Sequence, residues 1–171
     1  MISTFAAWLA LLLFAGTMVY AGIKDVATMT ISNRLVGFLL VAFAVLAPLA
    51  GVDFSTIWLS ILVASAVLAC TFTFFAFGWI GGGDAKLAAA TVLWLGFELM
   101  SVYLIWASII GGALTLLIIQ FRMMPMPAVL SGQAWAERLH RMDSGVPYGI
   151  ALSAAALLVY PDSIWMKTAG F

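Results

Sequence analysis

The stretch "GGGDAKLAAATVLWLGFEL" at residues 81–99 decides the fold, because it places two charges directly before a long apolar run. Asp84 and Lys86 precede an apolar segment that Glu98 alone interrupts with a charge before Arg122. That segment is too long to cross a membrane once, since one helical span needs about 20 residues. We therefore predict a tight turn near Gly96–Glu98 with a helix on each side of it.

The composition of the whole chain indicates an all-α integral membrane protein. Of its 171 residues, 65% are hydrophobic and 8% are charged, whereas a soluble domain is about 25% charged. The net charge is zero and no basic cluster is present, which argues against a nucleic-acid partner. The apolar runs predict a single transmembrane domain, residues 1–171, with about six helices at about 4–24, 34–51, 56–77, 85–97, 100–121 and 147–160.

The basic residues predict the orientation of these helices. Six of the seven fall in three loops on the same side of the membrane: Lys24, Arg34, Lys86, Arg122, Arg138 and Arg141. Because cytoplasmic loops are enriched in lysine and arginine, we expect that side to be cytoplasmic and both termini to lie opposite. We predict that the loop at about 122–146 carries a short surface helix capped by Ser131 or Gly132.

The residues that bind metals are nearly absent from this sequence. Cys70 is the only cysteine and His140 the only histidine, so neither an intrachain disulfide nor a cysteine-based zinc site can form. We predict no metal and no cofactor. We expect Cys70 to be a small buried apolar residue and His140 to lie at the membrane interface.

Asp25 and Asp84 are the strongest candidates for a functional site. Ionisable groups at membrane depth cost several kcal/mol and mark functional sites, and the predicted orientation puts both carboxylates on the cytoplasmic side. Two close carboxylates share one proton, because they cannot both ionise cheaply. The ionised group can take a proton from water while the protonated one polarises a peptide carbonyl. This pair is therefore the minimum that aspartic proteolysis requires.

Simpler interpretations of both aspartates are also open. Asp25 can end a helix and pair with Lys24 or Arg34, and Asp84 can cap the helix that follows it. A different functional class is a small transporter or channel subunit that uses the two acids for proton or cation transfer. Against that class, both acids lie near one face of the membrane, and the chain has no inverted repeat.

The three consecutive glycines before Asp84 are not needed for a helix cap. Gly81, Gly82 and Gly83 cost backbone entropy, so they indicate either a positive φ or the close approach of another backbone. A peptide substrate laid along this loop is one such backbone.

Three segments together resemble the prepilin peptidases, a family of Gly-x-Gly-Asp intramembrane aspartyl proteases. They are "DVATMTISN" (residues 25–33), "GGGDAKL" (residues 81–87) and "VPYGIAL" (residues 146–152). Ser32 stands where the family has proline, and no basic residue follows Asp25 before Arg34. The chain also lacks the paired Cys-x-x-Cys extension of longer members. It is therefore similar to the short, peptidase-only form that serves tight-adherence (Flp) pili.

The resemblance implies a multi-pass protease of the bacterial cytoplasmic membrane with Asp25 and Asp84 as its catalytic residues. Its substrate would be a prepilin-like precursor with a short basic leader and an apolar helix, cut after a glycine on the cytoplasmic side. A pseudo-peptidase scaffold is disfavoured, because both aspartates are present. We assign the remaining candidates to substrate binding or to the site loop: Gly81, Gly82, Gly83, Lys86 and Asn33.

Two of these candidates have more specific expected roles. Lys86 has three open roles: holding Asp84 ionised, contacting the substrate, or anchoring the chain at the cytoplasmic face. Either Ser32 or Asn33 can cap the second helix, and of the two we expect Asn33 to do so, near the site. Besides the substrate, the lipid bilayer is the expected partner.

Overall fold

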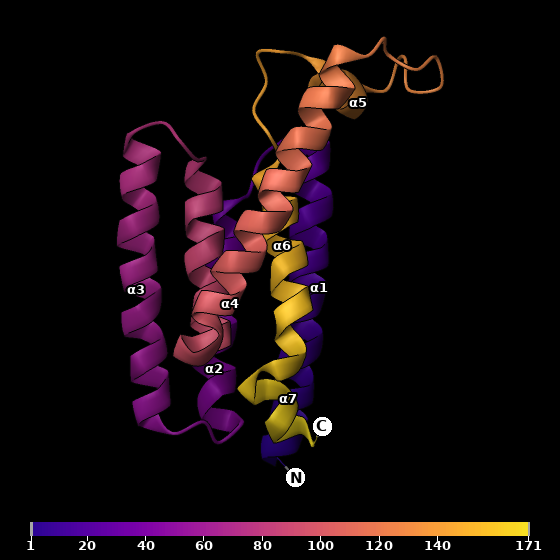
Figure 1. The fold of residues 1–171 in the computed structure, drawn as a ribbon. Coiled ribbons are helices and arrows are strands. Elements are labelled where there is room, and N and C mark those ends of the chain that lie inside the picture. The colour runs from indigo at the N-terminus through magenta and orange to yellow at the C-terminus, as the bar shows by residue number, and fades with distance from the viewer. Residues whose placement is uncertain (1, 171) are drawn as a thin grey trace.

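The computed structural model describes residues 2–170, and every regular element in that range is helical. The all-α class is therefore confirmed. Figure 1 shows the helices running alongside one another, with α3 at one edge and both termini at the end opposite α5. In chain order the elements are α1 (Ile2–Thr28), α2 (Asn33–Leu49), α3 (Phe54–Ala76), α4 (Gly82–Met123), α5 (Ala134–His140), α6 (Tyr148–Val159), a 3-10 turn (Tyr160–Asp162) and α7 (Ile164–Ala169).

Three helices of the described chain are long and apolar enough to cross a membrane, judged by length and composition: α1, α3 and α4. The helices α2 and α6 are also apolar but shorter than a typical span. These lengths support a membrane protein, while the six predicted spans remain a prediction.

The long helix α4 is broken at Gly96 and forms two segments. Gly96 has φ 75° and ψ −178°, a backbone conformation that glycine adopts without steric cost. Figure 1 shows the first segment running beside α3, after which the chain reverses and the second segment rises past α6 toward α5. The break falls within the turn that the sequence predicts near Gly96–Glu98.

Polar side chains fix where α2 and α3 begin. The Ser32 hydroxyl accepts a hydrogen bond from the Leu35 N–H at 3.3 Å, so Ser32 and not Asn33 caps α2. Asp53 caps α3 by accepting from the Thr56 N–H at 2.9 Å. Hydrogen bonds from Ser55 and Thr56 lower the pKa of Asp53 to about 2. Each cap satisfies backbone donors that have no partner within their own helix.

Three predictions about local structure are wrong. The first helix extends to Thr28, so Asp25 lies inside α1 and does not follow its end. Helix α5 begins at Ala134 with Gln133 at its N-cap position, so neither Ser131 nor Gly132 caps it. Cys70 is exposed on α3, because this helix turns most of its apolar surface away from the other helices.

A cluster of large aromatic side chains packs together at the end of the bundle near α7. Trp94 of α4 lies between Phe14 of α1 and Trp165 of α7, with ring centroids 5.2 Å and 4.9 Å away. The Trp94 indole donates to the Leu39 carbonyl at 3.1 Å, and the Trp165 indole donates to the Trp94 carbonyl at 2.8 Å. Each hydrogen bond fixes the orientation of a buried indole ring, which apolar packing alone would leave less defined. This cluster joins α1, α2, α4 and α7 at the end away from the candidate site.

Candidate active site

The candidate site is a cavity at the end of the bundle where α1 ends and α4 and α6 begin. Its volume is about 660 Å³. Asp25 of α1 and Asp84 of α4 both line it, so the structure brings together the two acids that the sequence singled out. The other lining residues are 29–31, 78–83, Gly145, Val146 and Tyr148.

Asp25 is held against the first turn of α6. Its side chain is buried, with 3% of the residue exposed, and the backbone amides of Gly149 and Ile150 face its carboxylate. The N-terminus of a helix stabilises a negative charge through its unpaired N–H groups and its dipole. Among residues 2–170, nothing forms a hydrogen bond with the Oδ2 atom of Asp25.

Gly149 permits this close contact between α6 and Asp25. A Cβ atom at position 149 would lie 2.7 Å from Asp25 Oδ2 and 2.8 Å from Ile31 Cδ1, both shorter than ordinary van der Waals contact. The sequence motifs did not identify Gly149 as a site residue. The available signal was a poor helix former just after Pro147 at a helix start, where glycine indicates close packing.

Asp84 is the third residue of α4, and Gly81 occupies the N-cap position. The interpretation of Asp84 as the cap itself is therefore wrong. Its carboxylate instead turns back toward the Gly81 N–H, as the acidic side chain of a capping box does. A Cβ atom at position 81 would lie 2.8 Å from Asp84 Oδ2. The charges of Asp84 and Asp25 also interact electrostatically.

The other two glycines before Asp84 contact the chain's own residues. A Cβ atom at Gly82 would lie 3.1 Å from the Phe75 ring, and one at Gly83 would lie 3.1 Å from Ile31 Cβ. Neither glycine has a positive φ, which excludes that explanation for the triplet. The groups nearest to these two positions are side chains of α3 and of the loop after α1, and the approach of a substrate backbone stays a prediction.

Lys86 bonds to Asn33 and not to Asp84. The Lys86 amine donates to the Asn33 side-chain oxygen at 2.9 Å, which links the first turns of α2 and α4 at an exposed position. Neither aspartate of the cavity forms a salt bridge with another described residue. The one ion pair among the described residues joins Arg141 to Asp143 at 2.6 Å, outside the cavity lining. The proposed pairing of Asp25 with Lys24 or Arg34 is thus absent from the described structure.

Arg122 anchors the loop that forms one wall of the cavity. Its guanidinium donates to the carbonyl oxygens of Leu139, Ser144 and Gly145 at 2.8, 2.9 and 2.8 Å. Arg138 of α5 in turn donates to the Ala27 carbonyl near the end of α1. From the sequence we predicted only that these two arginines lie on the cytoplasmic side, because the contacts of a basic residue are not visible in sequence.

The family to which this chain belongs can be identified from its sequence, independently of the cavity described above. The pattern of the type IV leader peptidase family matches residues 12–116, more than half of the chain. The matched region contains Asp25, the glycine triplet and Asp84 but ends before Gly149. No curated protein and no solved structure gives a significant match.

Proposed function

Because the chain belongs to the type IV leader peptidase family, which implies protease activity, we propose that it is an aspartic endopeptidase of the bacterial cytoplasmic membrane. Its proposed substrate is a prepilin-like precursor with a short basic leader and an apolar helix, cut after the glycine that ends the leader. The observation that carries this proposal is the meeting of Asp25 and Asp84, from two different helices, in one cavity.

The proposed chemistry uses the two carboxylates as a pair that shares one proton. The ionised carboxylate takes a proton from water, and the resulting hydroxide adds to the carbon of the scissile carbonyl. The protonated carboxylate donates a hydrogen bond to the carbonyl oxygen, where negative charge develops. The carbon–nitrogen bond then breaks as a proton passes to the departing amine. The two roles belong to the pair, since coupled acids titrate together.

We further propose that the cavity faces the cytoplasm and that the two segments of α4 are separate spans, which gives six spans in total. The reversal at Gly96 and the position of both termini at one end (Figure 1) support this topology. In a Cys70→Ser background, we expect a cysteine at Ser131 to react with an impermeant thiol reagent only from the cytoplasmic side. Labelling of that cysteine from the outer side would contradict the topology.

Co-expression with a prepilin-like precursor tests the activity, with leader removal followed as a change in precursor size. We expect Asp25→Asn and Asp84→Asn each to abolish processing while the protein stays in the membrane fraction. Asp162→Asn, the same change at an exposed acid of the 3-10 turn, should process normally.

Two results would contradict this proposal. Wild-type processing by either single variant would show that the two aspartates do not act as a catalytic pair. An uncut precursor, together with a proton or cation flux that both variants abolish in vesicles, would favour the transporter class instead.

A further inference from the structure

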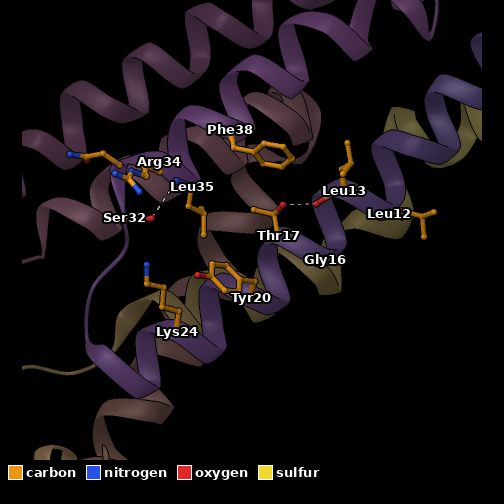
Figure 2. Close-up of a pocket in the computed structure, with 11 residues that line it drawn as sticks. Leu12, Leu13, Gly16, Thr17, Tyr20, Lys24, Ser32, Arg34, Leu35 and Phe38 are labelled. Atoms are coloured by element: carbon orange, nitrogen blue, oxygen red, sulfur yellow. Dashed lines mark hydrogen bonds between the residues drawn. The ribbon is translucent and has the colours of Figure 1, made fainter.

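A second and larger cavity lies between α1 and α2, with a volume of about 870 Å³ (Figure 2). It shares no lining residue with the cavity that holds Asp25 and Asp84. The proposed protease chemistry therefore does not use it.

The two ends of this cavity differ in chemistry. Figure 2 shows Lys24, Arg34 and the Tyr20 hydroxyl gathered toward one end, near the start of α2. Toward the other end the walls are apolar and consist of Leu12, Leu13, Gly16 and Phe38. An occupant that fits both ends has a negatively charged head and an apolar tail.

The two basic side chains have no acidic partner in the described part of the chain. The Lys24 amine lies 5.8 Å from the centre of the Tyr20 ring, and the described ion pair involves neither Lys24 nor Arg34. Two unpaired cations at the mouth of one cavity attract an anion, and at a membrane surface the abundant anions are lipid phosphates.

The distance between the basic end and the far apolar end of this cavity suits a lipid tail. Lys24 and Leu12 are twelve residues apart on α1, which corresponds to about 18 Å of helix. One leaflet of a bilayer contributes about 15 Å of hydrocarbon. A Cβ atom at Gly16 would meet nothing within 4 Å, so the wall is open beside this residue.

We propose that this cavity binds an anionic phospholipid. The phosphate lies between Lys24 and Arg34, and one acyl chain lies along Leu12, Gly16 and Phe38. The basic leader of the proposed substrate suits this mouth poorly, because like charges would meet there. The lipid would also contact Asn33, which lines the same cavity and bonds to Lys86 two residues after Asp84. A lipid in this cavity would therefore lie beside the Asn33–Lys86 hydrogen bond that connects α2 to α4.

Native mass spectrometry of the purified full chain in a non-ionic detergent tests the head-group contacts. We expect the protein to retain phosphatidylglycerol more strongly than phosphatidylcholine with identical acyl chains. Lys24→Gln and Arg34→Gln should each weaken phosphatidylglycerol binding about fivefold, the loss expected for one basic residue near an anionic lipid surface. Lys167→Gln removes an exposed cation from α7 and should leave binding unchanged.

A matched pair of glycine variants tests the tail. Gly16→Leu fills the middle of this cavity, whereas Gly112→Leu adds the same side chain to α4 at a position where a Cβ atom also meets nothing within 4 Å. Both variants should remain folded with similar Tm values, because a Cβ fits at both positions, and only Gly16→Leu should weaken lipid binding.

Three outcomes would overturn the proposal. Equal retention of the two lipids, or an equal loss in Lys167→Gln, would show that the two cations do not select the head group. Unchanged phosphatidylglycerol binding by Gly16→Leu would show that no acyl chain occupies the groove. If Gly16→Leu and Arg34→Gln raise the KM for the precursor but leave lipid binding unchanged, the groove holds the apolar helix of the substrate instead. Because these readouts measure lipid binding directly, they do not depend on whether the chain cleaves a precursor.

Discussion

Replacing Gly149 by alanine would place a methyl group against the Asp25 carboxylate. The new Cβ would lie 2.7 Å from Oδ2 and 2.8 Å from Cγ of Asp25, whereas ordinary contact begins at 3.4 Å. The carboxylate or the start of α6 must therefore move by about 0.7 Å, the difference between 3.4 and 2.7 Å. Ile31 Cδ1, at 2.8 Å from the same Cβ, limits movement of the methyl group in the other direction.

This displacement should reduce cleavage far more than it reduces folding. Misplacing a reacting group by about 1 Å costs roughly 100-fold in rate, while an extra methyl in a packed site costs about 1–3 kcal/mol of stability. We expect Gly149→Ala to process a precursor about 100-fold more slowly than wild type and to remain folded in the membrane.

The assay is the initial rate of leader removal by the purified protein, with the Tm of the same sample measured alongside. Gly112→Ala is the matched control, because a Cβ at that position meets nothing within 4 Å and it should cleave normally. A wild-type rate for Gly149→Ala, in protein that remains folded, would refute the argument that Gly149 sets the position of a catalytic Asp25.

Three further predictions concern other parts of the chain. Gly81→Ala should slow leader removal with little change in Tm, because its Cβ would lie 2.8 Å from Asp84 Oδ2; an unchanged rate would contradict this. Arg122→Met should lower the Tm by about 5 °C and expose the loop before α6 to limited proteolysis, whereas Arg141→Met, which removes an exposed ion pair, should do neither. Asp53→Ala should lower the Tm at neutral pH. Since the pKa of Asp53 is lowered from 3.8 to about 2 in the folded state, its ionised form stabilises the fold above pH 3.8, and the Tm difference should shrink as the pH falls toward 2. A Tm difference that does not change with pH would contradict this role.

The sequence predicted the two acids of the site but not what surrounds them. Asp25 and Asp84 could be placed on one side because basic residues orient helices and because acids at membrane depth are costly. The contact between Asp25 and Gly149 depends on how α6 packs against α1. No local sequence pattern predicts how α6 packs against α1. Gly149 indicates that a neighbouring group can come close to the backbone, but the sequence does not show that this group is Asp25.

Helix ends were predicted less well for a related reason. The charge of Lys24 suggested that the first helix ends there, yet α1 continues to Thr28. A charged residue is compatible with a helix interior when a neighbouring element stabilises its charge, and the backbone amides in the first turn of α6 do so for Asp25. By contrast, Gly96 breaks α4 through its own backbone conformation, so the sequence indicated this break locally.

The edge position of α3 connects one wall of the candidate site to a helix that packs mainly against α4. Only three residues of this helix are buried, Ser60, Val63 and Val67, so most of its surface faces away from the other helices. Trp79, which lines the cavity with Asp25 and Asp84, stacks on two phenylalanines at the end of α3. A change in the tilt of α3 would therefore move Trp79 and the cavity wall that it forms, whereas the aromatic cluster near α7 ties α1, α2, α4 and α7 together at the other end of the bundle.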